Sequence, residues 1–319
     1  MREREEWRAW PNSIRTGLEQ ASKAGVAQEM LRTHHLTRIL EEFDRTGVRC
    51  LLMKGEALAL SHYATPGTRA RCDSDLFIRI KDIARTKAAM RDIGFMITSP
   101  IYKSHQFTVM PSGDRSGLIH FDVHWRILNH PRYARILNFM ETFAGAVGVP
   151  GLDNVRVPGV VDALLLACMH RFGSESHDRN RLIWIYDVHL MVTAMTQLEL
   201  TEFATKALER GVQAICLDGL NQSQVCFKTD VSPGVKRQLE SPDRPQSFPR
   251  RYSESHLSLL IDDLKALPDW NSRLALLGEL FLPSPDFLMM RYGRVNRFWL
   301  PLLYLRQVFG GIVKRLSLR

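Results

Sequence analysis

The sequence lacks the features that mark several common protein classes. Its 319 residues contain no internal repeat, and without a run of about 18 uninterrupted apolar residues we expect no membrane-spanning helix. Its five cysteines are scattered, odd in number and never spaced as CxxC, which argues against a zinc site or a disulfide framework. The first residues are charged and do not form the apolar core of a secretory signal. We therefore expect a soluble protein of the reducing cytoplasm.

The composition is that of a globular protein with a basic surface. Hydrophobic residues make up 45% and charged residues 24% of the chain, which is enough to build both a core and a charged exterior. The formal net charge of +9 favours polyanionic partners such as nucleotides, nucleic acids or an anionic membrane surface. A basic surface with no specific partner would have the same charge, so this feature alone selects no function.

Hydrophobic periodicity predicts an α+β protein in consecutive parts. Residues 1–47 are predicted to form helices that pack on the core. Residues 48–150 alternate between apolar strands and amphipathic helices and end with a hairpin over 106–124, which predicts a mixed β-sheet with flanking helices. Residues 151–319 are predicted to form a mostly helical domain with a loop at 228–255, where proline, serine and charged residues are frequent.

The rest of the chain is organised around residues 51–76. An apolar strand breaks at Lys54-Gly55 and continues as a short helix. Such a turn presents backbone N–H groups and the positive end of a helix dipole to a phosphate. The side chain of Lys54 would add a positive charge there. Arg69 and Arg71 follow a Pro-Gly turn and are predicted to face the same phosphates, because planar guanidinium groups suit oxyanions.

Acidic residues beside this turn predict a divalent-metal site. Asp73 and Asp75 are two positions apart and would share one face of a strand, where paired carboxylates suit a hard cation such as Mg²⁺. Asp122 is the best candidate for a third carboxylate, and His124 would lie on the same face. Cations held there would activate an acceptor hydroxyl and stabilise a leaving pyrophosphate, with Asp122 as ligand or base. A DxD pair also occurs in solvated bends, so the prediction depends on the order of the motifs.

This order of motifs resembles the nucleotidyltransferase superfamily that includes DNA polymerase β-like enzymes. More closely, it resembles an uncharacterised nucleotidyltransferase family with the pattern LLKG(A/E)AL…Y…R…DIDLLV, followed by a strand with (I/F)D(L/V)HW. The matching stretches are LLMKGEAL at 51–58, Tyr63, Arg69, DSDLFI at 73–78 and FDVHW at 121–125. The similarity continues into the helical part at 164–170, 181–191 and 281–292.

The resemblance implies a nucleotidyltransferase core that uses Mg²⁺ or Mn²⁺ and an NTP. The metal carboxylates that it implies are Asp73, Asp75 and Asp122. Lys54-Gly55 stands where better-known superfamily members have Gly-Ser, so a serine hydroxyl is missing from the expected phosphate contact. Ser74 replaces the usual apolar residue between the two aspartates, where it would face away from the metals.

Further polar and aromatic residues are candidates for the walls of the cleft. The auxiliary candidates are Tyr63, His124, His170, His177, Arg181 and Asp187. Those in the helical part would line the nucleotide or acceptor side, but a buried hydrogen bond between a histidine and Asp187 explains the same pattern. Trp184 and Tyr186 either stack on a base or pack as core aromatic residues.

The predicted reaction is Mg²⁺-dependent transfer of NMP from an NTP to an acceptor hydroxyl, with release of pyrophosphate. A protein or peptide, a sugar or lipid intermediate, a small molecule and an RNA end all remain open as acceptor. The alternatives are a phosphotransferase that uses the same site and a non-catalytic module that binds nucleotide, nucleic acid or a membrane surface. The basic amphipathic stretch 298–319 fits either packing onto the helical part or contact with an anionic membrane.

Overall fold

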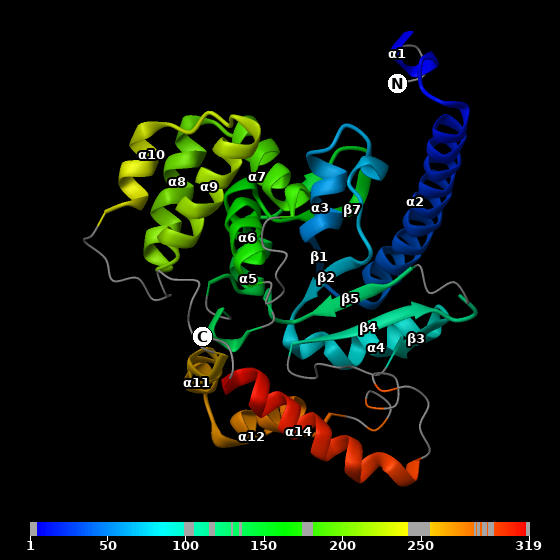
Figure 1. Cartoon of the computed structure of the whole chain (residues 1–319), viewed down its shortest axis with the longest axis vertical. Helices are drawn as coiled ribbons and strands as arrows, with labels where there is room; N and C mark the ends of the chain where they lie inside the picture. The colour runs from blue at the N-terminus through cyan, green and yellow to red at the C-terminus, as the bar shows by residue number, and fades with distance from the viewer. Residues whose placement is uncertain are drawn as a thin grey trace.

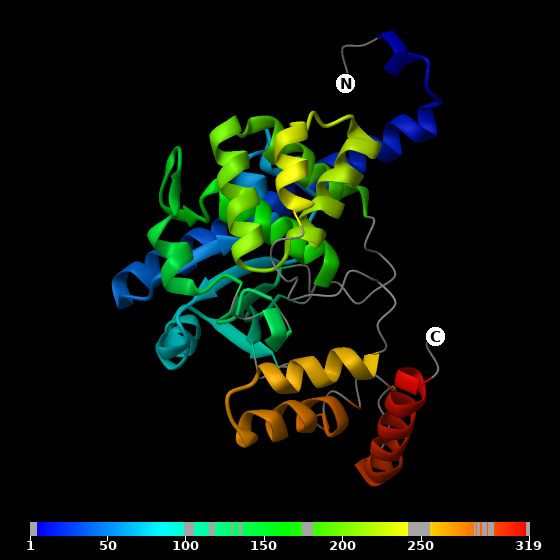
Figure 2. The ribbon, with the colours of Figure 1, turned by 90° about the vertical axis from the view of Figure 1, so that its left-hand side faces the viewer.

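The structure is a computed structural model that describes most of the chain (Figure 1, Figure 2). The described residues are 5–98, 105–114, 119–128, 130–133, 136–173, 181–241, 256–283, 285, 288, 292 and 297–316. The candidate residue His177, residues 242–255 of the predicted loop and part of the stretch 281–292 lie outside them.

The described chain begins with a short helix, α1 (Glu5–Arg8), and a long one, α2 (Asn12–Thr46). Helix α2 ends where Gly47 adopts the left-handed conformation (φ 71°), which glycine reaches without a Cβ clash. The second half of α2 buries Leu36 and Phe43 against the sheet, whereas its first half extends beyond the sheet (Figure 1). The predicted N-terminal helices are therefore present.

A mixed sheet forms the centre of the described structure. Its strands are β1 (Cys50–Met53), β2 (Ser74–Ile78), β3 (Phe95–Thr98), β4 (Gln106–Pro111) and β5 (Phe121–His124). Their order across the sheet is β1-β2-β5-β4-β3. Strands β2 and β5 pair in parallel, and the other neighbours pair antiparallel. The predicted hairpin is confirmed as β4 and β5.

Side-chain alternation assigns each face of this sheet to a different set of helices. Leu52 and Leu76 point toward α2 and α4, whereas Met53 and Phe77 point toward the helices after residue 159. The connecting elements are α3 (Lys54–Ser61), η1 (Pro66–Thr68), η2 (Ile80–Asp82) and α4 (Ile83–Asp92). Asp75 pairs with Met53 across the antiparallel ladder and therefore lies on the second face.

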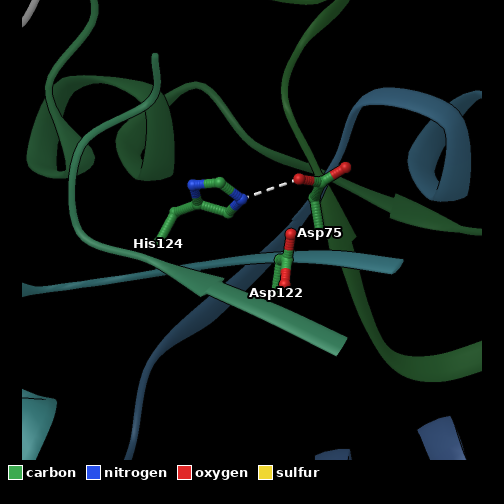
Figure 3. Close-up of side chains that lie close together, drawn as sticks. All are labelled: Asp75, Asp122 and His124. Atoms are coloured by element: carbon green, nitrogen blue, oxygen red, sulfur yellow. Dashed lines mark hydrogen bonds and ion pairs between the residues drawn. The ribbon is translucent and has the colours of Figure 1, made fainter. Parts of the chain in front are cut away.

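The parallel pairing of β2 with β5 brings two distant acidic residues together. Asp75 is the direct register partner of Asp122 on the neighbouring strand (Figure 3). Partners in adjacent strands point to the same face, so Asp122 also faces the helices that follow.

The structure contains elements over residues 131–157 that the sequence analysis did not predict. They are η3 (Pro131–Tyr133), α5 (Phe139–Ala144) and a hairpin of β6 (Val147–Val149) and β7 (Leu152–Val157). The hairpin packs Val155 and Val157 into the core beneath α2, while most of its other residues are exposed. Such short, largely exposed strands carry little hydrophobic alternation, which explains why they were missed.

The helices after the sheet form a compact group. They are α6 (Val160–Gly173), α7 (Leu182–Ala194), α8 (Gln197–Glu209), α9 (Gln213–Phe227) and α10 (Pro233–Leu239). Helix α10 lies within the loop that was predicted for residues 228–255 and corrects that prediction. Pro233 occupies the first turn, the Ser232 hydroxyl accepts the Gly234 N–H, and Val235 and Leu239 are buried, so local capping and burial outweigh the loop-like composition.

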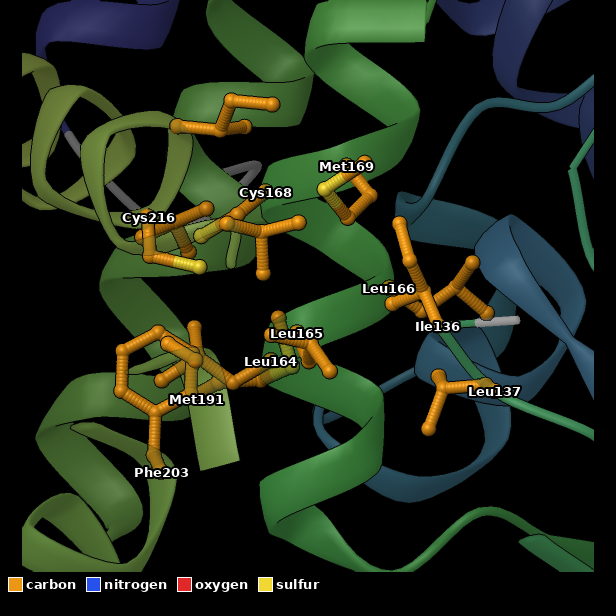
Figure 4. Close-up of a cluster of buried hydrophobic side chains, with 14 of the residues drawn as sticks. Ile136, Leu137, Leu164, Leu165, Leu166, Cys168, Met169, Met191, Phe203 and Cys216 are labelled. Atoms are coloured by element: carbon orange, nitrogen blue, oxygen red, sulfur yellow. The ribbon is translucent and has the colours of Figure 1, made fainter. Parts of the chain in front are cut away.

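One hydrophobic cluster joins the sheet to these helices (Figure 4). Leu51 and Phe77 from the sheet belong to the same cluster as Leu164 on α6. The cluster contains residues from both sides of the domain boundary that was predicted at residue 150, and this boundary remains a prediction. Helices α6 and α9 approach each other closely in this cluster, because a Cβ placed on Gly219 would lie 2.8 Å from the Cys168 sulfur.

The C-terminal helices lie at the end of the molecule opposite α1 (Figure 1, Figure 2). They are α11 (His256–Ala266), α12 (Trp270–Phe281), η4 (Arg297–Trp299) and α14 (Leu300–Leu316). Asp263 of α11 accepts hydrogen bonds from His130 and Arg132 and so ties this group to η3. None of the helices in the described residues is both long and apolar enough to cross a bilayer.

The contact at Gly219 gives a test of the helical core. Gly219→Ala should lower the free energy of unfolding by about 1–3 kcal/mol, because the buried Cys168 side chain must move. A Cβ on Gly278 in α12 would have no atom within 4 Å, so Gly278→Ala should raise the free energy of unfolding by up to about 1 kcal/mol. Urea denaturation measures both, and equal stability of the two variants would contradict the packing described.

Candidate metal and nucleotide site

Two carboxylates and an imidazole converge on one face of the sheet. Asp75 and Asp122 are register partners on β2 and β5, and His124 follows Asp122 by two residues and so shares its face. One ligand atom from each lies within 4.8 Å of the others. We call Asp75, Asp122 and His124 the acidic cluster (Figure 3).

Hydrogen bonds fix the carboxylates of the acidic cluster. Oδ1 of Asp75 accepts from the Lys54 ammonium at 2.5 Å and is 2.7 Å from Nε2 of His124. The two oxygens of Asp122 accept from the Thr108 hydroxyl at 2.5 Å and from the Gln106 amide at 3.0 Å. Both carboxylates are thus held in place before any ligand binds, which is the condition for a preorganised site.

Electrostatics keep Asp75 ionised. Burial disfavours its charged form, but the Lys54 ammonium and the hydrogen bond from His124 outweigh burial and hold the pKa of Asp75 far below its usual range. Burial alone would lower the pKa of Lys54, but the negative charge of Asp75 outweighs burial and raises this pKa above its usual value. Burial and the charge of Lys54 lower the pKa of His124, so its imidazole is neutral near physiological pH. The neutral ring can donate Nε2–H to Asp75.

The turn between β1 and α3 lies at the predicted Lys54-Gly55 break and has an unusual backbone. Lys54 is in the left-handed region at φ 51°, which a residue with a side chain seldom adopts, and α3 begins at this residue. Strained backbone of this kind costs free energy and occurs frequently at functional sites. A Cβ on Gly55 would lie 3.6 Å from the Arg69 guanidinium, so this turn also contacts the next part of the site.

The role of Asp73 as a metal carboxylate remains a prediction. Asp73 directly precedes β2, which begins at Ser74, and it is not among the three residues whose ligand atoms lie within 4.8 Å of one another. Burial of its carboxyl group and the charges of Asp75 and Asp122 raise its pKa to about 6, so Asp73 lies close enough for these two carboxylates to act on it. The acidic cluster thus contains two of the three predicted aspartates together with the auxiliary candidate His124.

Arg69 forms a buried ion pair with a helix that is distant in sequence. Its Nε and Nη2 donate to the two oxygens of Asp187 at 2.8 and 2.7 Å, and both side chains are buried. The Tyr63 hydroxyl donates to the same carboxylate at 2.8 Å. Asp187 therefore pairs with Arg69 and Tyr63, and within the described residues no histidine forms a hydrogen bond to it. A phosphate role for Arg69 remains a prediction, since its fork is bound by a carboxylate here.

Arg71 and Ser74 belong to a buried network behind the site. Arg71 donates to Glu56 at 2.8 Å and to Glu29 of α2 at 2.7 Å. The Ser74 hydroxyl donates to Glu56 at 2.6 Å and accepts from the buried Arg32 at 3.1 Å. The network connects α2, α3 and the start of β2, and it places Ser74 away from the acidic cluster, as predicted. Because the carboxylates of Glu56 and Glu29 bind Arg71, a contact between Arg71 and phosphate also remains a prediction.

A small cavity of about 30 Å³ adjoins Lys54 between α3, α6 and α7. It is lined by Lys54, Gly55, Ala57, Leu58, Arg69, Pro158, Ala163, Leu166, Ala167, His170, Trp184 and Asp187. The ring of His170 meets Trp184 edge-on at 4.9 Å, and the Arg181 guanidinium lies over the Trp184 ring at 5.2 Å. Tyr186 instead packs between Tyr63 and Phe227, as a core aromatic residue would.

The sequence analysis missed several residues that shape the acidic cluster. Gln106 and Thr108 alternate along β4 and both bind Asp122. Their spacing of two residues on a predicted strand was visible, but the register of β4 against β5 was not. The buried His105 ring stacks on His124 with centroids 6.5 Å apart, and burial lowers its pKa to about 2. No spacing rule pointed to this histidine.

The acidic cluster fits a divalent cation. Two carboxylates and an imidazole nitrogen within 4.8 Å offer the donor types that such ions bind, and carboxylate oxygens suit Mg²⁺ and Mn²⁺. Nδ1 of His124 is buried and makes no hydrogen bond within the described residues, whereas Nε2 faces Asp75 (Figure 3). Nε2 is therefore the ring atom that would bind the cation, in the neutral tautomer with the proton on Nδ1, so the hydrogen bond that Nε2–H can donate to Asp75 belongs to the cation-free site.

Breaking the Arg69–Asp187 pair should destabilise the protein strongly. Asp187→Asn leaves a buried guanidinium without its counter-ion and should lower the free energy of unfolding by about 3–5 kcal/mol. Tyr63→Phe removes one hydrogen bond and should cost about 1 kcal/mol. Arg45→Gln breaks the solvent-exposed pair with Glu42 and should change stability little. Denaturant titration ranks the variants, and a different order would contradict this assignment.

His170 should make stability sensitive to acid. Burial lowers its pKa from 6.5 to about 3, so below pH 6.5 the unfolded chain takes up a proton that the folded chain does not. The free energy of unfolding should therefore fall as the pH drops from 6.5 toward 3, by at most about 1.4 kcal/mol per pH unit from this group. His170→Gln should reduce that slope in denaturant titrations, and an unchanged slope would contradict the burial argument.

Comparison with known proteins agrees with this geometry. The family model described as uncharacterised nucleotidyltransferase matches residues 2–228. Among curated proteins, none matches the chain. The family match includes the whole sheet, the acidic cluster and the helices through α9. The chain therefore belongs to the uncharacterised nucleotidyltransferase family.

Proposed function

We propose that this protein transfers a nucleoside monophosphate from an NTP to an acceptor hydroxyl at the acidic cluster. The observation that carries the proposal is the direct pairing of Asp75 with Asp122 on adjacent parallel strands, beside the Lys54-Gly55 turn. Two carboxylates next to a lysine and a helix start supply what a cation-bound triphosphate needs. Membership of the nucleotidyltransferase family supports the same class of reaction.

Each residue has a distinct role in the proposed reaction. Asp75, Asp122 and His124 would hold Mg²⁺ or Mn²⁺, which stabilises negative charge on the phosphates when bound. Lys54 would contact the phosphates from its present position beside Asp75, and the first N–H groups of α3 would bind the same oxygens. Thr108 and Gln106 would keep Asp122 oriented throughout the reaction.

The bond changes balance without a further reactant. The acceptor oxygen forms a bond to the α-phosphorus, and the bond from the α-phosphorus to its bridging oxygen breaks. The electron pair of that bond leaves with pyrophosphate. The hydroxyl proton passes to a carboxylate of the site, for which Asp122 is the candidate.

The acidic cluster can be tested through nucleotide binding and label transfer. Calorimetry should show that ATP binds in the presence of Mg²⁺ and not with EDTA, and that Asp122→Asn weakens this binding. With α-labelled NTPs in a lysate of the native host, Asp122→Asn and Asp75→Asn should reduce labelling of the acceptor by at least about a hundredfold, because cation binding supplies several kcal/mol. Sorting the labelled product by size then identifies the acceptor class.

A matched control separates chemistry from folding. Asp230→Asn makes the same change at an exposed carboxylate between α9 and α10 and should retain full transfer. Circular dichroism checks that each variant is folded. A folded Asp122→Asn protein with wild-type transfer would contradict the proposal. Transfer of γ-label without α-label would assign a phosphotransferase instead, and the absence of Mg²⁺-dependent NTP binding would indicate a non-catalytic module.

A further inference from the structure

The C-terminal stretch of the chain carries positive charge and no negative charge. Residues 287–319 contain seven arginine and lysine residues and neither aspartate nor glutamate. This stretch also lies beyond residues 2–228, which match the family. Its helix α14 therefore lies outside the part of the chain that the family match covers.

One side of α14 holds the helix to its neighbours. Leu303 is buried, the Tyr304 hydroxyl donates to the Pro283 carbonyl at 2.8 Å, and Gln307 accepts from the Tyr292 hydroxyl at 3.1 Å. At 100° per residue, positions 303, 304 and 307 lie on one side of the helix. The contacts on this side correspond to packing of the stretch 298–319 onto other helices, which was one of the two interpretations of the sequence.

The opposite side of α14 is apolar and exposed. Leu302, Leu305 and Phe309 recur at helical spacing, and Phe298 precedes them in η4. Their exposed fractions are 55%, 54% and 63% along α14 and 81% for Phe298. We call these residues, Phe298, Leu302, Leu305 and Phe309, the apolar stripe. Scattered apolar residues are normal on a surface, but a continuous stripe on one helix indicates a docking surface.

Charge and aromatic residues beside the stripe indicate what it docks on. Trp299 is half exposed next to Phe298, and tryptophan and other aromatic side chains favour the boundary between lipid tails and headgroups. Arg306 is exposed and lies between Leu302 and Phe309 on the helix surface. A helix with apolar residues on one side and arginine beside them, in a stretch of sequence without acidic residues, matches an anionic lipid surface.

We propose that the apolar stripe of α14 binds reversibly to the surface of an anionic membrane. The helix would lie in the plane of the interface, since no helix in the described part of the chain can span a bilayer. An acidic protein groove is the competing occupant. The acid-free stretch 287–319 favours the lipid surface, because diffuse negative charge attracts every basic residue without requiring a matched partner for each.

The test uses the full chain and vesicles of stated composition. In flotation assays the protein should bind vesicles of phosphatidylcholine mixed with phosphatidylglycerol, and it should bind pure phosphatidylcholine vesicles weakly. Replacing Leu302, Leu305 and Phe309 together with serine should reduce partitioning by at least about tenfold, because buried apolar area drives insertion. Arg306→Gln should weaken binding less and reduce its dependence on salt.

A matched control replaces exposed apolar residues elsewhere. Met140, Leu198 and Val225 are similarly exposed on α5, α8 and α9, and serine at all three should leave vesicle binding unchanged. Equal binding by the stripe variant and the wild type would overturn the proposal, as would wild-type protein that fails to bind phosphatidylglycerol vesicles. Mg²⁺-dependent ATP binding should persist in the stripe variant. Failure of the membrane proposal can therefore be distinguished from failure of the proposed reaction.

Discussion

The structure of the site depends on one buried carboxylate, that of Asp75. Its Oδ1 receives both the Lys54 ammonium and the His124 ring, and the strand that carries it pairs with Asp122 on the next strand. An ionised carboxylate in this position would be costly without those partners. The strained backbone at Lys54, the neutral state of His124 and the position of β5 are all consistent with the need to stabilise this single charge.

A second buried charge pair extends the site into the helices. Arg69, which follows the Pro-Gly turn, binds Asp187 on α7, and Tyr63 from the end of α3 joins them. The residues that the sequence suggested for phosphate contact thus have structural partners that position the turn beside the acidic cluster. Arg71 does the same on the other side through Glu56 and Glu29. Contacts with both α7 and α2 therefore stabilise the site.

The sequence predicted most of the fold because its signals were local. Helical periodicity, the Lys54-Gly55 break and the alternation near Asp75 each depend on neighbouring residues, and these elements are present. What failed depended on pairing between distant segments. The start of β2 at Ser74 follows from its ladders with β1 and β5. The partners Thr108, Gln106 and Asp187 likewise required a register or a helix contact that local pattern does not encode.

The hydrophobic cluster shared by Leu51, Phe77 and Leu164 has a consequence for how this molecule can evolve and move. Enzymes built from two independently folded lobes can open like a hinge, and either lobe can be exchanged by recombination. Here the sheet that bears the carboxylates completes its own interior with side chains from α6. Separating the sheet from α6 would expose these side chains to water, so movement of loops and side chains costs less free energy than a hinge-like opening, and an exchanged half would have to cover the same side chains.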